Sequence, residues 1–526
     1  MNRVAANGLL LVTGLALGGT ALAQLQTTSS QYWHQGSPGV GVQPEEDAEF
    51  GRALSVGDYN CDGLDDAAFG MPNDDLVGAT DGGRVLVLYA ENSIIGLSAE
   101  GRQVWGQAGP AVPGDPSPFE SFGLSLASGD FDNDGCDDLA IGVPFDDVEG
   151  LNSAGGVNVL YGSPGSGLSD QNIDYWHQGG GSAGGALEAN DNFGRALAVG
   201  DFDDDGFDDL AIGIPGEGVG SGPSLVSNAG AVQVLFGGST GLSASQDVIL
   251  VRGSNLFGEP VAFEQIGSVL AAGDINQIAG DELVIGIPDY DISAALTRAG
   301  AIMVVSDIDG NVFNVTYTQD SEDIPGVAEE DDQLGDQLAV GDFDGDGFDE
   351  IAATVRGEGI GQPPSEIENA GAVNVFNFSN TDGHQLWTQD EIPSIPQELP
   401  EAFDRFGSAL VSADFDGDGL DDLAIGVSRE DFNALSNPGL VQVLYSVENE
   451  GLTAAGAQTF RMIVNPPGNQ DNFGDALAAG TINGGNSADL VVGAPGDTIS
   501  EAGTGSAVVL YSAPIDSLFG DRFEDD

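Results

Sequence analysis

The sequence contains one short segment whose residue types and spacing could bind a metal ion. The stretch "GDFDNDGCDDLAIGVP", residues 129–144, carries five carboxylates within nine positions, from Asp130 to Asp138. An acidic run is often a solvated loop, but here an apolar segment of strand length follows at once, and the run recurs along the chain. The spacing D-x-[DN]-x-D-G-x-x-[DE] places oxygen donors at positions 1, 3, 5 and 9, with the carbonyl of position 7 available and a glycine at position 6 for the sharp turn. Hard oxygen donors in a flexible loop favour Ca²⁺. Mg²⁺ is second choice because its geometry is stricter, and a soft metal would need His or Cys clusters.

Five copies of this segment have a complete donor set, which predicts about five Ca²⁺ sites. The predicted ligands, with the residue at position 7 contributing its backbone carbonyl, are Asp58, Asn60, Asp62, Leu64 and Asp66; Asp130, Asp132, Asp134, Cys136 and Asp138; Asp201, Asp203, Asp205, Phe207 and Asp209; Asp342, Asp344, Asp346, Phe348 and Glu350; and Asp414, Asp416, Asp418, Leu420 and Asp422.

Two further copies of the segment lack part of the donor set. The fourth retains Asp274 and Glu282 but has Ile278 at position 5, so no tight site is expected there. The seventh has Thr481 and Gly485 and is expected to be empty. EF-hand and dockerin loops share the first half of the pattern, but they lead into helices and end in an acid at position 12, whereas the last acid here is at position 9.

The acidic segment belongs to a longer repeat, exemplified by "FGRALAVGDFDDDGFDDLAIGIP" from residue 193. Seven copies begin at residues 50, 122, 193, 266, 334, 406 and 473, at a spacing of 67 to 73 residues. In each copy a short strand precedes the acidic loop, a second strand follows it, and two more strands come after a Gly-rich connection. Seven four-stranded units without convincing helices predict an all-β, seven-bladed β-propeller of antiparallel blades.

The fourth strand of several units ends in an aromatic residue followed two positions later by glutamine. These pairs are Trp105 and Gln107, Trp176 and Gln178, Tyr317 and Gln319, and Trp387 and Gln389. The tryptophans could be sugar-stacking platforms of a lectin, but their fixed place in the repeat favours packing between blades. The seventh unit has no fourth strand of its own, and "SSQYWHQG" near the N-terminus contains the same pattern at Trp33 and Gln35. Residues 31–35 are therefore predicted to complete the seventh blade and to close the ring.

Charge and the terminal segments limit the possible partners. The 526 residues include 85 Asp plus Glu and 12 Lys plus Arg, and the formal charge is -73. Nucleic acid and anionic membrane surfaces are disfavoured as partners because both need clustered basic residues. Residues 1–23 resemble a signal peptide cleaved after Ala23, and no other segment is apolar enough to span a bilayer. We expect a propeller over residues 24–513, an acidic tail over 514–526, and a protein that is secreted, at the cell surface or periplasmic.

Two questions stay open at this point. Cys61 and Cys136 are the two cysteines of the chain and could form a disulfide in an oxidising compartment. No catalytic constellation is apparent, because His34, His177 and His384 lie in or beside the fourth-strand pattern, where they are expected to be structural.

The F-G opening, the acidic loop and the closing G-x-P, such as Gly493-Ala494-Pro495, resemble the FG-GAP repeats of integrin α-subunit propellers. The resemblance covers residues 31–512, and the likeness is to bacterial secreted relatives of that family. It implies calcium loops on the lower face and partners on the upper face, although the set of copies with metal loops differs from the integrin set. We expect a monomeric, calcium-binding adhesion or binding module without catalysis, whose upper face takes a protein or glycan ligand. That face includes Glu45, Glu46 and Glu330, so a cationic ligand would suit it. The alternatives are a lectin-like or polysaccharide-processing propeller and a passive surface scaffold.

Overall fold

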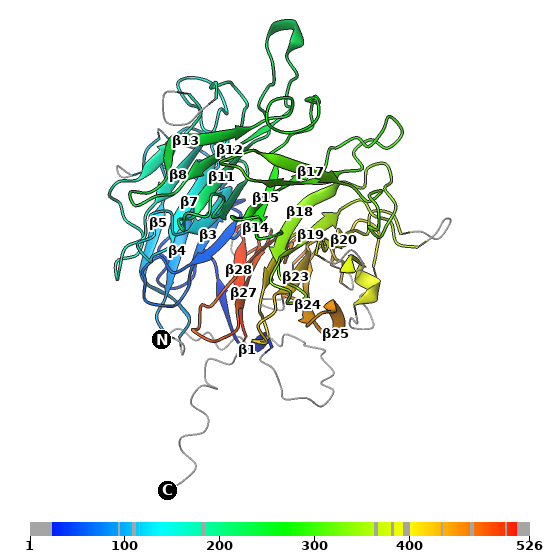
Figure 1. Cartoon of the computed structure of the whole chain (residues 1–526). Coiled ribbons are helices and arrows are strands. Elements are labelled where there is room, and N and C mark those ends of the chain that lie inside the picture. Colours follow the sequence, from blue (N-terminus) through cyan, green and yellow to red (C-terminus); the bar gives the residue numbers. More distant parts are fainter. Residues whose placement is uncertain are drawn as a thin grey trace.

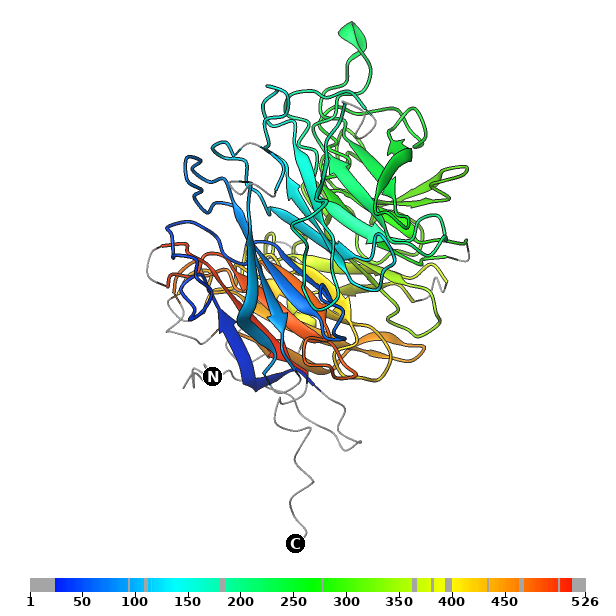
Figure 2. The ribbon, with the colours of Figure 1, turned by 90° about the vertical axis from the view of Figure 1, so that its left-hand side faces the viewer.

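The computed structural model consists of seven four-stranded antiparallel sheets arranged around a central axis (Figure 1 and Figure 2). It describes residues 24–92, 95–107, 112–114, 116–179, 185–276, 278–361, 367–379, 383–392, 400–432, 435–462, 468–499 and 502–512. The predicted signal peptide and the acidic tail lie outside the described residues. The all-β, seven-bladed propeller predicted from the sequence is confirmed.

Each blade takes its strands in chain order from the axis outward, except for the last. Blades 1 to 3 comprise β2 (Leu54–Gly57), β3 (Asp66–Met71), β4 (Arg84–Ala90) and β5 (Leu97–Trp105); β6 (Ser125–Gly129), β7 (Asp138–Val143), β8 (Gly156–Leu160) and β9 (Asp174–Trp176); and β10 (Leu197–Gly200), β11 (Asp209–Ile214), β12 (Ala231–Phe236) and β13 (Ser243–Leu250). Blades 4 and 5 comprise β14 (Val269–Gly273), β15 (Glu282–Ile287), β16 (Ala301–Ser306) and β17 (Phe313–Tyr317); and β18 (Leu334–Gly341), β19 (Glu350–Val355), β20 (Ala372–Phe376) and β21 (Gln385–Trp387). Blade 6 comprises β22 (Leu410–Ala413), β23 (Asp422–Val427), β24 (Leu440–Val447) and β25 (Gly451–Phe460). In the described connections lie the short 3₁₀ helices η1 (Gly222–Ser224) and η3 (Gln389–Glu391).

Blade 7 is assembled from both ends of the described chain. Its sheet has the order β1 (Gln26–Trp33), β28 (Ser506–Tyr511), β27 (Asp489–Ala494) and β26 (Ala476–Gly480). Trp33 pairs with Ala507 in an antiparallel register, and the N-terminal and C-terminal colours lie side by side in Figure 2. The predicted closing strand is therefore present, but it starts earlier, at Gln26, and ends before Gln35.

The second strand of every blade is buried along its whole length because blades pack on both of its faces. This packing explains the glycine in the G-x-P part of the repeat. A side chain added at Gly142 would lie 2.3 Å from the carbonyl oxygen of Gly194, the F-G glycine of the next blade, which is closer than real side chains approach. Blade 5 has Thr354 at this place, and its hydroxyl instead donates a hydrogen bond to the Gly407 carbonyl at 2.8 Å.

Apolar clusters fill the spaces between neighbouring blades. One cluster joins Val85 and Val87 of blade 1 to Leu139 and Ile141 of blade 2, with the opening residue Phe122 fully buried between them. Within the described part of the chain, no helix has the length and apolar character needed to cross a lipid bilayer.

Candidate metal centres and blade junctions

The acidic segments form the loops between the first and second strands of the blades, all at one end of the propeller. The loop of blade 2, for example, connects β6 to β7. We call this end the lower face. The upper face is the opposite end, which carries the connections between the second and third strands and those between blades.

In four of the five predicted sites, the carboxylates at positions 1, 3 and 9 come together. One oxygen from each lies within 4.8 Å of the other two in blades 2, 3, 5 and 6. The residues concerned are Asp130, Asp132 and Asp138; Asp201, Asp203 and Asp209; Asp342, Asp344 and Glu350; and Asp414, Asp416 and Asp422. The position-5 carboxylates are not part of these groups of three and are exposed in all five loops.

Blade 1 differs because an amide replaces the carboxylate at position 3. Asn60 is almost buried, and its Nδ2 lies 3.4 Å from Asp66 Oδ2. Its Oδ1 is buried and has no hydrogen-bond partner in the described ranges, and the same is true of Asp203 Oδ1 at the same position of blade 3. Buried oxygens without partners are costly, so both atoms fit a loop that receives a cation.

Backbone hydrogen bonds hold each loop in shape. The two carboxylate oxygens of Asp130 accept the N–H groups of Asp134 at 3.0 Å and Gly135 at 2.9 Å. Asp134 Oδ1 in turn accepts the N–H of Cys136 at 3.0 Å. Gly135 has φ +91°, a conformation that favours glycine. The sequence therefore folds the loop so that its carboxylates converge although they repel one another.

The position-9 acid is the most buried ligand candidate. Asp138 accepts the N–H of Phe131 at 3.0 Å and that of Gly162, after the third strand, at 2.8 Å. Burial raises its pKa to about 8, and the charges of Asp132 and Asp130 add to this effect. Burial likewise raises the pKa of Asp66 and Asp422 to about 8. This crowding of carboxylates is what a divalent cation would relieve.

The copies with incomplete donor sets have other partners at these positions. In blade 4, Asn276 Nδ2 lies 3.3 Å from Ser306 Oγ, and Ile278 is 47% exposed. In blade 7, Asp489 occupies position 9 and accepts the N–H groups of Asn483 and Ser512, both at 2.9 Å.

A second ring of acids, at position 8, was not recognised from the sequence. The carboxylate of Asp137 in blade 2 accepts the N–H of Asp58 in blade 1 at 2.8 Å. The same contact links Asp208 to Asp130 at 2.8 Å. The acid at position 8 is visible in the repeat. Its hydrogen-bond partner lies in another blade, so spacing within one repeat could not reveal the contact. Position 8 thus ties each metal loop to its neighbour.

A disulfide joins the first two loops. Cys61, at position 4 of the first loop, is bonded to Cys136, at position 7 of the second, with their Cα atoms 4.8 Å apart. The open question about these cysteines is settled by the proximity of adjacent loops on the lower face.

At the upper face, the fourth-strand glutamines connect successive blades. Each is buried and its side-chain amide donates to an acid that follows the second strand of the next blade. These hydrogen bonds are Gln35 to Asp74 at 2.7 Å, Gln107 to Asp146 at 3.1 Å, Gln178 to Glu217 at 2.8 Å, Gln319 to Glu358 at 3.0 Å and Gln389 to Glu430 at 2.6 Å. Trp105 is buried in the cluster between blades 1 and 2. The packing interpretation of the aromatic–glutamine pairs is supported over the sugar-platform one.

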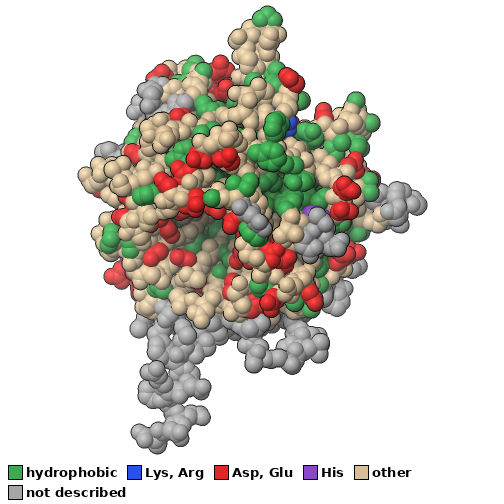
Figure 3. Space-filling view, in the orientation of Figure 1, with side chains coloured by type: hydrophobic (Ala, Val, Ile, Leu, Met, Phe, Trp, Pro, Cys, Tyr) green, Lys and Arg blue, Asp and Glu red, His purple; other side chains and the backbone are tan. Residues whose placement is uncertain are grey.

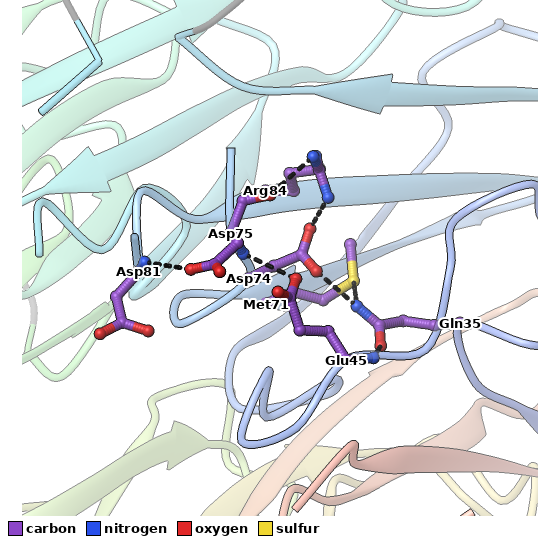
Figure 4. A network of polar contacts seen from close by, with 7 residues as sticks. All are labelled: Gln35, Glu45, Met71, Asp74, Asp75, Asp81 and Arg84. Carbon is purple, nitrogen blue, oxygen red and sulfur yellow. Dashed lines mark hydrogen bonds and ion pairs between the residues drawn. The ribbon is translucent and has the colours of Figure 1, made fainter. Parts of the chain in front are cut away.

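Figure 4 shows the junction between blades 7 and 1 in detail. Asp74 accepts a hydrogen bond from Gln35 and forms an ion pair with Arg84. The Gln35 Oε1 accepts the N–H of Glu45 at 3.0 Å. Glu45, expected on the open upper face, is instead half-buried, its carboxylate accepts the N–H of Asp75 at 2.9 Å, and burial raises its pKa to about 7. Across the face drawn in Figure 3, acidic side chains far outnumber basic ones.

The comparisons with known proteins agree with this geometry. The FG-GAP repeat model matches residues 122–160, 193–235, 334–376 and 406–444, which fall in the four blades whose loops gather three carboxylates. Integrin alpha-PS2 of Drosophila melanogaster is 29% identical over 252 residues, covering 47% of this chain and 16% of the relative. Integrin alpha-V of Gallus gallus is 26% identical over 266 residues, covering 50% and 22%.

The other matches are an enzyme and a solved structure. Phosphatidylinositol-glycan-specific phospholipase D of Bos taurus is 32% identical over 171 residues, covering 32% of this chain and 19% of the relative. The chain thus spans about a fifth of the length of these curated relatives. A solved structure described as "Structure of Dos1 propeller" aligns with 92% of this chain and 95% of its own at TM-score 0.41 and 11% identity.

The repeat matches, the integrin similarity and the seven closed blades lead to one identification. The chain is a seven-bladed β-propeller that carries FG-GAP repeats and is similar, over about half of its length, to integrin α-subunits.

Proposed function

We propose that this propeller is an exported binding module that is stabilised by Ca²⁺ and does not turn over its ligand. The observation that carries the proposal is the convergence of three carboxylate oxygens within 4.8 Å in each of four equivalent loops. Hard oxygen donors suit Ca²⁺, and the position-3 oxygens of Asn60 and Asp203 that lack hydrogen-bond partners among the described residues fit the same chemistry. Blade 1, with Asn60 and Asp66, is the fifth proposed site.

Calcium would act on the fold at a distance from the ligand. Each loop joins the two inner strands of a blade, and position 8 ties it to the preceding loop. A bound cation would neutralise carboxylates that otherwise repel one another at the lower face. The partner surface would then be the upper face, whose shape the loops maintain indirectly.

Three exposed aromatic residues on the upper face support a binding role. Phe119, Phe263 and Phe403 each lie three residues before the opening of a repeat and are 63%, 63% and 52% exposed. Their φ angles are 70°, 65° and 75°, which is unusual for a bulky residue. Exposed apolar groups held in a strained backbone are typical of contact sites. A protein or glycan partner with apolar surface and positive charge would complement these residues and the nearby acids.

The proposal is tested by separating stability from binding. Chelation of Ca²⁺ should lower the Tm of the full chain, and calorimetry should count about five loop sites at the affinities of extracellular modules. A glycan and protein array probed with the mature chain should identify the partner. Replacing the three phenylalanines by alanine should then weaken binding without changing the calcium-dependent Tm. An unchanged Tm after chelation would contradict the calcium part of the proposal.

An enzymatic role is the second candidate, and the match to phosphatidylinositol-glycan-specific phospholipase D favours it. That match covers 19% of the relative, so it does not carry the activity to this chain. Incubating the purified protein with a glycosylphosphatidylinositol-anchored substrate and with polysaccharides would decide. Cleavage at an enzyme-like rate, abolished by a single upper-face substitution, would replace the binding proposal.

A further inference from the structure

A second repeated acid lies at the upper face, two residues before the opening residue of most repeats. The side chains are at most 2% exposed, and they are Glu120, Asp191, Glu264, Asp332, Asp404 and Asp471. Blade 1 has Ala48 at this place. Each acid lies at the junction where the preceding blade contributes its fourth-strand residue. In the junctions that keep an acid after the second strand, it adds a second carboxylate.

In the junction between blades 1 and 2, these groups leave buried oxygens without partners. Glu120 Oε2 accepts the N–H of Ser117 at 2.7 Å, but Glu120 Oε1 has no hydrogen-bond partner among the residues that the structure describes. Gln107 donates to Asp146, while its Oε1 is equally without a partner, although Gln107 is 2% exposed. Burial raises the pKa of Asp146. A hydrogen bond from Tyr175 at 2.5 Å and the charge of His177 oppose this rise.

The junction between blades 2 and 3 repeats this arrangement. Gln178 donates to Glu217, and within the described part of the chain its Oε1 has no hydrogen-bond partner. Asp191 accepts the N–H of Glu188 at 2.8 Å, and both Glu217 and Glu188 add negative charge beside it. Burial, followed by these charges, raises the pKa of Asp191 to about 7. Each of these two junctions therefore contains two carboxylates and an amide oxygen.

Two other junctions of the same ring contain a positively charged arginine, whereas Gln107 and Gln178 are neutral. Between blades 3 and 4 the glutamine is replaced by Arg252, whose Nη2 lies 3.0 Å from Glu264 Oε1. The second acid is replaced by Tyr290, whose ring lies 5.6 Å from the guanidinium. Between blades 7 and 1 the first acid is absent, and Arg84 pairs with Asp74 (Figure 4). A guanidinium thus supplies the positive charge at both of these junctions.

Glycine packing shows that Arg252 and Gln107 reach equivalent places. A side chain added at Gly258 would lie 2.4 Å from Arg252 Nη1, and one added at Gly114 would lie 2.2 Å from Gln107 Nε2. Both glycines stand eight residues before a repeat opening and have φ of +98° and +113°. The end of Gln107 therefore occupies the place of Arg252 Nη1. Unlike Arg252, which pairs with Glu264, Gln107 carries no positive charge to offer Glu120.

We propose that Ca²⁺ binds at the upper face between Gln107, Glu120 and Asp146, and equivalently between Gln178, Asp191 and Glu217. These sites are separate from the lower-face loops and would join blades 1, 2 and 3, as Arg252 joins blades 3 and 4. Amide and carboxylate oxygens are the donors that Ca²⁺ takes, and its charge matches two carboxylates.

Equilibrium dialysis of the full chain against radioactive Ca²⁺ tests the proposal. Glu120→Gln should lower the number of bound ions by about one per chain, and Asp191→Asn should do the same, because each removes a charged ligand. Glu264→Gln is the matched control. It changes the same repeat position at an arginine junction and should leave the number of bound ions unchanged, whatever its effect on stability. Gln107→Arg, which copies the Arg252 junction, should also remove about one ion and covers the case in which Glu120→Gln fails to fold.

An unchanged ion count in Glu120→Gln, Asp191→Asn and Gln107→Arg would overturn the proposal. The same holds if Glu120→Gln raises the Tm at alkaline pH while the ion count stays the same, because the buried acid would then bind a proton and not Ca²⁺. These results leave the loop sites unaffected, since loop variants such as Asp132→Ala report on the lower face alone.

Discussion

At the scale of single residues, burial ranks the proposed Ca²⁺ ligands by how much each is expected to contribute to calcium-dependent stability. Positions 1, 3 and 9 of an acidic loop converge, whereas the position-5 carboxylate is exposed and accepts the N–H of position 7. A sequence pattern assigns these positions equal weight because it carries no information on burial. The structure therefore ranks two aspartates of the same loop, Asp416 and Asp418, which differ in exposure.

Asp416→Ala should cost more calcium-dependent stability than Asp418→Ala. Asp416 is 7% exposed and belongs to the group of three carboxylates in blade 6. A site with Kd near 10⁻⁴ M contributes about 1.4 kcal/mol at about 1 mM Ca²⁺ by mass action, and Asp416→Ala should lose most of it. Denaturant unfolding with and without Ca²⁺ measures the difference. Equal losses for the two variants would contradict the ranking.

The buried acid Asp404 predicts how stability changes with pH in calcium-free solution. Burial, followed by the charges of Glu401 and Asp431, raises its pKa to about 7 in the folded state. A raised folded pKa gives stability that is fully present below the unfolded pKa, near 4, and that is lost as the pH rises through about 7. Asp404→Asn should therefore flatten the fall in Tm between about pH 5 and about pH 8. The exposed Glu46 provides the control, since Glu46→Gln should follow the wild-type curve.

At the scale of elements, the repeat predicts most strands because each blade repeats the same alternation of apolar runs and turns. The sequence could not show contacts between blades. The carboxylate of Asp137 bonds to a loop in the preceding blade, and Gln107 donates to Asp146, which is 39 positions away in the next blade. The disulfide between Cys61 and Cys136 depends on the same proximity. Spacing within one repeat identifies ligands of one loop, whereas these residues act across a junction that forms only in the closed ring.

Closure of blade 7 by β1 predicts a strong effect of removing that strand. Gln31, Tyr32 and Trp33 pair with β28, and Tyr32 also donates to Asp497 at 2.5 Å. Deleting residues 26–33 would expose the edge of β28, which would then be free to pair with other chains. We expect a lower Tm and concentration-dependent aggregation in light scattering. A deleted protein that melts like the wild type and stays monomeric would show that another segment closes the ring.

At the scale of the whole molecule, the chain has a formal charge of -73, and most of its acidic residues lie in one closed ring. Repulsion between these charges opposes the compact state. The repulsion is concentrated at the lower face because the acidic loops lie together there. Two agents can relieve this repulsion, and they differ in how they act. Salt screens exposed charges over a Debye length, whereas a bound cation neutralises buried carboxylates that salt reaches poorly.

This distinction gives a test of how calcium stabilises the propeller as a whole. In a chelator, raising salt from about 0.01 M to about 0.15 M shortens the Debye length from about 30 Å to about 8 Å and should raise the Tm. Choline chloride should work as well as sodium chloride, because screening needs no specific cation. Ca²⁺ at about 1 mM adds little ionic strength, yet should raise the Tm further, because five loop sites at the tight end would contribute about 7 kcal/mol. If 1 mM Ca²⁺ raised the Tm no more than salt of equal ionic strength, the loops would act only as a diffuse negative surface, and the convergence of their carboxylates would have no role in stability.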